Sequence, residues 1–260
     1  MIVLPTSVGD HHLSTAPIPA RDRLIFAMDV PSPDEAKRIA DELGDSVLFY
    51  KLGLELFMSG GCFELLDWLR SKGKKVFVDL KFFDVPQTVM SAVRQLRGRG
   101  ASFVTVHGND DILAAAVLGR GAPGAGSVGP AEHLGILAVT VLTSLDQHDI
   151  EALGFQTSVS DLVLSRARRA LEIGCDGVIS SGLEVKRLRQ EHREGFLIVV
   201  PGIRPVVNRA EDDQKRTVDV EDAFLDGADY IVVGRPIKSA PDRRQAAEAI
   251  QARIGRLFGC

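Results

Sequence analysis

The chain has 260 residues, of which 45% are hydrophobic and 25% are charged, and its formal net charge at pH 7 is −4. This composition is ordinary for a globular protein with a substantial core, and the acidic balance argues against nucleic acid as a partner, because nucleic-acid binders usually carry a clear basic excess. The three cysteines are widely spaced, which argues against a disulfide framework or a zinc site and is typical of reduced thiols in a cytoplasmic protein.

The sequence contains no segment that predicts membrane insertion, since no apolar run approaches the roughly 18 residues needed to cross a bilayer. Residues 1–20 include three prolines and lack the basic start and apolar block of a signal peptide, so they are expected to form a flexible N-terminal extension. No low-complexity linker divides the remainder. We therefore expect residues 21–260 to form a single catalytic domain.

Eight short apolar segments, rich in β-branched and aromatic residues, predict β-strands. In chain order they are Leu24–Met28, Val47–Tyr50, Val76–Val78, Phe103–Val106, Gly135–Leu142, Gly177–Ser180, Phe196–Val200 and Tyr230–Val233.

Helical patterns separate the strands. Ser32 and Glu35 form a capping box that opens the first helix, with Pro33 at its first position. The expected helices after it are Phe57–Arg70, Val85–Arg97, Ile112–Leu118, patterns extending to Ile173, Leu183–His192, a helix beginning near Asp219, and Asp242–Leu257. The glycine-rich segment Gly119–Gly129 predicts a flexible surface loop.

Eight strands alternating with helices over this length predict an α/β fold of the (β/α)₈ type, the TIM barrel. A doubly wound open sheet is the alternative. The eightfold count and the absence of an early glycine fingerprint argue against the open sheet.

Polar residues recur at the carboxyl ends of the predicted strands, the face on which such barrels build active sites. They are Asp29, Lys51, Asp79, Lys81, His107, Thr143, Arg204 and Arg235. Each has a structural alternative when taken alone, such as a helix cap or a buried histidine. Their convergence on one rim favours a functional site.

The third strand carries the densest group of charges. Asp79 and Lys81 are two residues apart, so their side chains project to the same side of the strand. Asp84 follows in a turn that Pro86 helps to define. A structural ion pair at the end of the strand is the alternative to a catalytic array.

The last two strands end in residues suited to phosphate. Gly202 and Gly234 allow close backbone approach, while Arg204 and Arg235 offer bidentate partners. The polar stretch 205–216 is long enough to act as a lid. These features predict a phosphate site without naming a substrate.

The stretch Asp79-Leu-Lys81-Phe-Phe-Asp84-Val-Pro-Gln-Thr88 closely resembles the Asp-x-Lys-x-x-Asp signature of orotidine 5′-phosphate decarboxylases. The resemblance extends from Leu24 to the end of the chain. Further matching blocks are Ala27–Asp29, Lys51–Gly53, Val104–His107, Ala138–Ser144, Pro201–Arg204, Asp213-Gln214 and Gly234–Pro236.

The resemblance implies decarboxylation of orotidine 5′-phosphate to uridine 5′-phosphate (UMP), without a cofactor. It implies that Lys81 donates a proton to C6 after CO₂ leaves and that Asp79 lies against the substrate carboxylate. Lys51, Asp79, Lys81 and Asp84 would form an array of alternating charge. A preorganised ammonium group would stabilise the negative charge that develops on the ring carbon.

The resemblance also implies roles in binding and assembly. Asp29 and Lys51 would hold the ribose hydroxyls, and Thr143 would meet the pyrimidine edge. Asp84 and Thr88 would reach into the site of a second copy, which implies a homodimer. No nucleic acid or membrane partner is expected.

The phosphate roles implied by the resemblance fall on the last two loops. Arg235, the Gly234 backbone and Gln214 would hold the phosphate, and Arg204 matches the arginine of the phosphate loop.

Two alternatives remain beside this interpretation. A metal-dependent decarboxylase or aldolase of the same barrel type would need an acidic residue where Lys51 stands, because a lysine repels Mg²⁺. A non-catalytic phosphate-binding barrel is disfavoured because every charged position of the array is filled.

Overall fold

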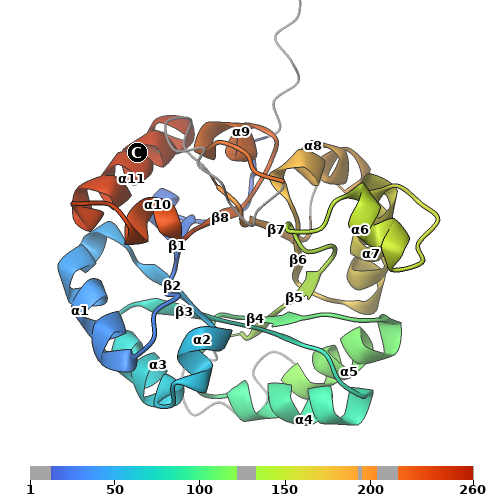
Figure 1. Ribbon diagram of the computed structural model, residues 1–260, viewed down its shortest axis with the longest axis horizontal. Helices are drawn as coiled ribbons and strands as arrows, with labels where there is room; N and C mark the ends of the chain where they lie inside the picture. The colour runs from blue at the N-terminus through green and yellow to red at the C-terminus, as the bar shows by residue number, and fades with distance from the viewer. Residues whose placement is uncertain (1–12, 122–132, 193–194, 204–215, 260) are drawn as a thin grey trace, which may run out of the picture.

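Eight parallel strands close into a barrel surrounded by helices in the computed structural model, which describes residues 13–121, 133–192, 195–203 and 216–259 (Figure 1). Each strand pairs with the next in sequence, and β1 pairs with β8. The strands are β1 Leu24–Ala27, β2 Phe49–Gly53, β3 Lys75–Phe82, β4 Phe103–Val106, β5 Gly135–Val139, β6 Gly177–Ile179, β7 Leu197–Val200 and β8 Tyr230–Val233. This closure confirms the TIM barrel, and the open-sheet alternative is wrong.

The predicted strands are all present, with bounds that shift where polar residues continue a strand. β3 runs on to Phe82, past the predicted end at Val78, because Asp79 still pairs with Gly53 of β2 and Phe82 with Val106 of β4. β5 ends at Val139, three residues before the predicted end.

Helices lie outside the strands around the whole barrel (Figure 1). They are α1 Pro33–Leu43, α2 Leu54–Met58, α3 Cys62–Ser71, α4 Pro86–Leu96, α5 Asp110–Arg120, α6 Gln147–Ala152, α7 Val159–Ile173, α8 Gly182–Glu191, α9 Val220–Leu225, α10 Arg235–Lys238 and α11 Arg243–Phe258. Short 3₁₀ turns occupy Ala20–Asp22 and Gly44–Ser46.

Two helix predictions require correction. The single helix expected over Phe57–Arg70 is two helices, because Gly60 and Gly61 adopt φ values of 81° and 67° and break it. Gly119, predicted to begin a loop, lies inside α5, where a Cβ would come within 2.6 Å of the Met90 carbonyl oxygen of α4. The rest of the predicted loop, from residue 122 on, falls outside the described residues.

Side chains alternate across each strand, so the barrel has an inner and an outer core. The inner core consists of Ile25, Ala27, Phe49, Phe77, Phe103, Leu137, Val199, Tyr230 and Val232. Two residues beyond Phe49, Phe77 and Phe103, on the same inner side, come Lys51, Asp79 and Thr105. The barrel interior is therefore apolar toward the amino ends of the strands and polar toward their carboxyl ends.

A separate charged network lies at the amino ends of the strands. Asp229, just before β8, pairs with Arg189 of α8 and accepts a hydrogen bond from Ser14. Arg23 donates to the Ala16 carbonyl oxygen over 3.0 Å. Part of the predicted N-terminal extension thus contacts the barrel, while residues 1–12 lie outside the described residues.

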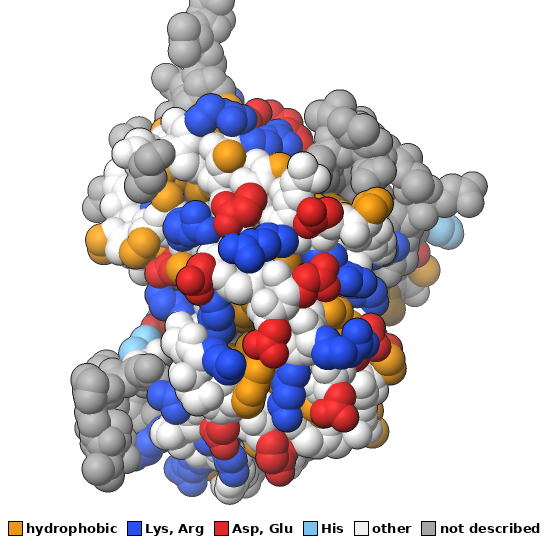
Figure 2. Space-filling view, turned by 90° about the vertical axis from the view of Figure 1, so that its left-hand side faces the viewer, with side chains coloured by type: hydrophobic (Ala, Val, Ile, Leu, Met, Phe, Trp, Pro, Cys, Tyr) orange, Lys and Arg blue, Asp and Glu red, His pale blue; other side chains and the backbone are white. Residues whose placement is uncertain are grey.

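The outer surface carries charges of both signs. On the face at the left of Figure 1, where α1 and α11 lie, acidic and basic side chains are interspersed (Figure 2). Arg243 of α11 pairs with Glu42 of α1 at 2.8 Å on this surface. Among the described residues, none of the helices combines the length and apolar character that spanning a bilayer requires.

Candidate active site

A cavity of about 420 Å³ opens at the carboxyl ends of the strands. Its apolar walls come from inner-core residues, among them Ala27, Phe77 and Val232. Its charged lining residues are Asp29, Lys51, Glu55, Asp79, Lys81, Arg235 and Lys238. A few charged groups set among apolar walls are the usual composition of a small-molecule site.

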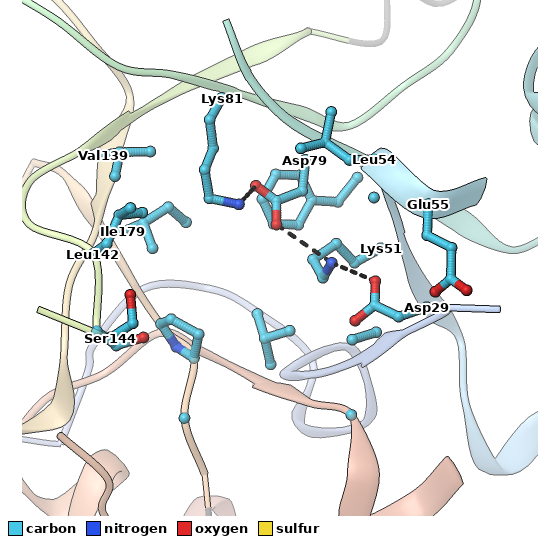
Figure 3. Close-up of a pocket in the computed structure, with 18 of the residues that line it drawn as sticks. Asp29, Lys51, Leu54, Glu55, Asp79, Lys81, Val139, Leu142, Ser144 and Ile179 are labelled. Carbon is cyan, nitrogen blue, oxygen red and sulfur yellow. Dashed lines mark hydrogen bonds and ion pairs between the residues drawn. The ribbon is translucent and has the colours of Figure 1, made fainter. Parts of the chain in front are cut away.

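Four of these charges form a continuous chain across the cavity (Figure 3). Lys81 Nζ lies 2.9 Å from Asp79 Oδ1, and Lys51 Nζ lies 3.3 Å from Asp79 Oδ2. Lys51 Nζ also lies 3.1 Å from Asp29 Oδ1. Cation and anion alternate, so each buried charge has a partner of opposite sign.

The mutual attraction of these groups outweighs their burial. Burial alone would lower the pKa of Lys51, but the charges of Asp79 and Asp29 leave that pKa above its ordinary value of 10.5. Burial alone would raise the pKa of Asp79, yet Lys51 and Lys81 hold it below 3.8. Both Lys51 and Asp79 are therefore ionised at neutral pH.

An irregularity in β3 sets the direction of Lys81. Between Val78 and Phe82 the register of β3 against β4 shifts, with four steps of β3 opposite two of β4. Lys81 has a φ of 48°, and within the described residues it is alone among non-glycine residues in having a positive φ. The backbone strain at such a residue is typical of functional sites.

Thr105 of β4 holds this irregularity in place. Its hydroxyl accepts a hydrogen bond from the Lys81 amide over 2.9 Å and donates one to Asp79 Oδ1 over 2.8 Å. The residue is fully buried, so these bonds are protected from water. One hydroxyl thus fixes both the backbone of the lysine and the carboxylate that binds its ammonium group.

Gly53 leaves the space that the Asp29–Lys51 pair fills. A Cβ at this position would lie 2.9 Å from Asp29 Oδ1 and 3.1 Å from Lys51 Nζ. The backbone of Gly53, with a φ of −103°, does not itself require glycine. The residue is small here because of the ion pair beside it.

The structure brings most of the sequence-predicted site residues together. Those lining the cavity are Asp29, Lys51, Asp79, Lys81, Thr143, Gly202, Gly234 and Arg235. Arg204 and Gln214 lie outside the described residues. Asp84 and Thr88 are exposed beside the start of α4 and do not line the cavity of a single chain.

His107 directly follows β4, as predicted, but does not line the active-site cavity. It lines a second cavity, of about 430 Å³, with Phe83, Arg166 and Arg169. β4 ends at Val106, and the His107 amide still donates to the Phe82 carbonyl oxygen of β3 over 3.0 Å. Burial, and then the charges of Arg166 and Lys81, lower the pKa of His107.

Sequence reasoning missed four polar residues of the site, one of which is Glu55 of α2. Thr105 could have been found from its phase, since it faces the same side of β4 as Phe103. Ser144 follows Thr143 along the cavity wall. Lys238 of α10 donates to the Asp29 carbonyl oxygen and so supports the loop after β1. The sequence around Lys238 carries no signal of this contact.

Comparisons with known proteins agree with the geometry. Residues 22–250 match the model of the orotidine 5′-phosphate decarboxylase / HUMPS family. An orotidine 5′-phosphate decarboxylase of Methylococcus capsulatus is 61% identical over 246 residues, which cover 95% of this chain and 97% of the relative. One of Xanthomonas axonopodis pv. citri is 49% identical over 93% of this chain and 96% of the relative.

A solved structure is similar over nearly the same span. The crystal structure of orotidine 5′-phosphate decarboxylase from Lactobacillus acidophilus aligns with a TM-score of 0.78 and 34% identity, covering 90% of this chain and 99% of that one. Together with the family match over most of the sequence, this similarity leads to one conclusion. The chain belongs to the orotidine 5′-phosphate decarboxylase / HUMPS family.

Proposed function

We propose that this protein decarboxylates orotidine 5′-phosphate to UMP, a step of pyrimidine nucleotide synthesis, without a cofactor. The observation that carries the proposal is the chain of alternating charge that ends at the Lys81 ammonium group. The names of the relatives supply the substrate. The site supplies a way to perform the reaction.

The chemistry required is the stabilisation of a carbanion. When the bond between C6 and the carboxylate breaks, the electron pair stays on C6 and CO₂ departs. An ammonium group already held at that position stabilises the developing charge and then transfers a proton to C6. Lys81, fixed by Asp79 through its side chain and by Thr105 through its backbone, suits this role.

Asp79 would lie against the substrate carboxylate. Its two oxygens already bind Lys81 and Lys51, and Thr105 donates to one of them, so it cannot turn away when substrate enters. The array keeps its geometry through the reaction. It therefore stabilises the developing charge without the reorganisation that surrounding water would have to undergo.

The remaining contacts follow the length of a nucleotide. Asp29 and Lys51 would hold the ribose hydroxyls, and Thr143 the pyrimidine edge. At the other end, the Gly234 backbone and Arg235 would bind the phosphate, at a loop position where such barrels commonly do so. Arg204 and Gln214 complete the phosphate site on the strength of the family resemblance.

The deciding experiment mixes the purified protein with orotidine 5′-phosphate in the absence of metal and follows the loss of substrate absorbance in the ultraviolet. We expect turnover that survives EDTA. Lys51 stands beside Asp79, where a metal-dependent sugar-phosphate enzyme would need another acid. Activity lost with EDTA and restored by Mg²⁺ would favour that alternative. Calorimetry showing nucleotide binding without turnover would favour a non-catalytic barrel.

We further propose that the enzyme is a homodimer in which Asp84 and Thr88 complete the site of the partner. Phe83 and Val85, on either side of Asp84, are 68% and 63% exposed, which is unusual for large apolar side chains. Leu54 and Met58 of α2 are similarly exposed. Apolar side chains gathered near an active-site motif are typical of a surface that another chain covers.

Mixing two inactive variants tests this shared site. In Lys81→Ala and Asp84→Ala chains each protomer lacks one residue of the array. Random reassociation makes half of the dimers mixed, each with one complete site, so we expect about a quarter of the wild-type activity to return. The control mixes Lys81→Ala with Asp111→Ala, which removes an exposed acid of α5. The Asp111→Ala chain keeps both Lys81 and Asp84, so mixing should not raise its activity. Absence of recovery in dimers that demonstrably exchange would contradict the shared site.

Two broader features belong to the same proposal. Cys62 and Cys175 are buried free thiols, which supports a reducing, cytoplasmic location. We place the catalytic domain at residues 21–260, preceded by an extension, and expect neither nucleic acid nor membrane to be a partner.

A further inference from the structure

A buried ion pair lies behind the wall of the active-site cavity. Arg216 Nη1 is 2.9 Å from Glu184 Oε1, and their side chains are 8% and 7% exposed. Glu184 belongs to α8, and Arg216 precedes α9. Neither residue lines the cavity, and the chemistry proposed above uses neither.

Arg216 binds three consecutive residues of the cavity wall. Its Nη2 donates to the carbonyl oxygens of Val141 and Leu142, each over 3.2 Å, and its backbone amide donates to that of Thr143 over 3.3 Å. All three of these residues line the cavity. A single arginine therefore satisfies the carbonyl groups of the segment that presents Thr143.

Apart from Arg216, the Leu145 amide also donates to the Leu142 carbonyl oxygen over 3.0 Å. β5 ends at Val139, so residues 141–143 lie beyond the strand pairing that fixes the rest of the wall. The strand-like contact continues only as far as Thr140, whose amide donates to the Ile179 carbonyl oxygen over 3.2 Å. The contacts with Arg216 thus help to fix the backbone at Thr143, beyond the end of the strand.

Arg216 is itself held firmly. Two residues on, Val218 forms a β-bridge with Ile203 and packs so closely on α8 that a Cβ at Gly182 would come within 2.2 Å of it. The Ser181 hydroxyl donates to the Arg216 carbonyl oxygen over 3.4 Å. The backbone at Arg216 is therefore fixed, which keeps its guanidinium group beside residues 141–143.

Stability alone does not explain this pair. Replacing a buried ion pair by apolar residues of similar volume is often neutral or stabilising, because of the cost of desolvation. Burial raises the pKa of Glu184 in spite of the neighbouring Arg216, a sign that the carboxylate is held at a cost. What an apolar pair could not do is donate to the Val141 and Leu142 carbonyl oxygens.

We propose that Arg216, oriented by Glu184, is a positioning residue that fixes the segment 141–143 so that Thr143 meets the nucleobase. The inference rests on the proposed function and deepens it, because it assigns the base-binding end of the site a support that lies outside the cavity. It predicts that loss of Arg216 weakens the binding of ligands that carry a base and leaves the binding of ligands without a base unchanged.

The test compares two competitive inhibitors, UMP and ribose 5-phosphate, which differ in the base. The first variant replaces both partners, Arg216→Met with Glu184→Met, and keeps the volume while it removes the donors. The second, Arg216→Lys, keeps the charge opposite Glu184 but loses the planar fork. We expect UMP inhibition to weaken about tenfold in the double variant, the equivalent of one well-placed hydrogen bond, and less in Arg216→Lys. Inhibition by ribose 5-phosphate should stay within about twofold of wild type.

Arg189→Met is the matched control. Arg189 is as buried as Arg216, pairs with the buried Asp229, and donates to the Gly227 and Phe196 carbonyl oxygens over 2.8 and 3.0 Å, but at the opposite end of the barrel. It should lower the melting temperature and leave the ratio of the two inhibition constants unchanged.

The outcomes separate the inference from the proposed function. Equal weakening of both inhibitors would show general distortion and overturn the inference. Wild-type UMP affinity in both the double variant and Arg216→Lys would overturn it as well. Absence of turnover in the wild-type protein would instead remove the proposed function, while the comparison of direct UMP and ribose 5-phosphate binding would still decide the role of Arg216.

Discussion

Lys81 combines a strained backbone with a side chain paired to a buried carboxylate. Its φ of 48° is costly for a residue with a Cβ, and the hydrogen bond from its amide to Thr105 stabilises that conformation. The ammonium group meets Asp79 at 2.9 Å. Neither feature helps a barrel to fold, so we attribute both to the reaction.

Lys81→Ala should therefore lower turnover of orotidine 5′-phosphate by at least about a thousandfold, because electrostatic stabilisation and proton donation are lost together. UMP should still bind, since Lys51 and Asp79 keep their pair. Steady-state kinetics and calorimetry measure the two effects. Lys72→Ala, which removes an exposed lysine of the surface, is the control and should leave both unchanged. Turnover close to wild type in Lys81→Ala would remove the lysine from its role.

Two glycine substitutions should separate steric from conformational effects. Gly53→Ala leaves an allowed backbone but forces a methyl group against Asp29 and Lys51, so we expect kcat/KM to fall about tenfold or more with little change in stability. Gly60→Ala meets open space but a φ of 81°, so it should cost about 1–2 kcal/mol of unfolding free energy and spare activity. Kinetics and urea unfolding of both variants give the comparison. A Gly53→Ala enzyme with normal kcat/KM would show that the ion pair can shift without consequence.

At the level of helices and strands, sequence patterns were most reliable where one side of an element is apolar. All eight strands were found because each contributes to both cores of the barrel. The end of β3 was missed, since charged residues that face the cavity look like the end of a strand. The break at Gly60 and Gly61 was missed because apolar residues continue on both sides of it.

The residues of the site also divide into those that the sequence could place and those that it could not. Placing Asp29, Lys51, Asp79 and Lys81 at one cavity needed only the strand order and the rule that barrel sites form at carboxyl ends. His107 follows a strand too, but it lines a different cavity, and the residue type alone does not signal that placement. The contacts of Arg216 were beyond prediction for another reason, since they join segments that are distant in sequence.

The N-cap of α1 is an element whose sequence signal can be tested directly. The Ser32 side chain accepts a hydrogen bond from the Glu35 amide over 3.3 Å, which is half of the predicted capping box. Ser32→Ala should cost about 1 kcal/mol of unfolding free energy, because the amide loses its acceptor. Ser91→Ala, in the interior of α4, makes the same chemical change where alanine is the better helix former, and should be neutral or slightly stabilising. Equal effects in urea unfolding would contradict the assignment of the cap.

Across the whole molecule, buried charges are concentrated at the two ends of the barrel. The amino end holds Asp229 with Arg189 and Arg23, and the carboxyl end holds the chain of alternating charge from Asp29 to Lys81. The apolar inner core separates them. Stability should therefore depend on pH through groups whose pKa differs between the folded and the unfolded chain, among them His107 and Asp79.

Acid should destabilise the protein in two stages. The pKa of His107 is lowered from 6.5 in the folded state, by burial and by Arg166 and Lys81, with the Arg169–Asp110 pair beside it in the same cavity. As the pH falls below about 6.5 the unfolded state takes up a proton that the folded state resists, so stability declines. The pKa of Asp79 is lowered from 3.8, so its contribution is present above that pH and is lost as the pH falls further.

His107→Gln should remove the first stage, because a neutral amide has no proton to gain. Urea unfolding between pH 5 and pH 7, in steps, measures the slope of stability against pH, which we expect to flatten in the variant. His148→Gln, at an exposed position of α6, is the control and should keep the wild-type slope. An unchanged slope in His107→Gln would mean that the cavity beside β4 accommodates a charged histidine, and that acid destabilisation begins only when the carboxylates are protonated.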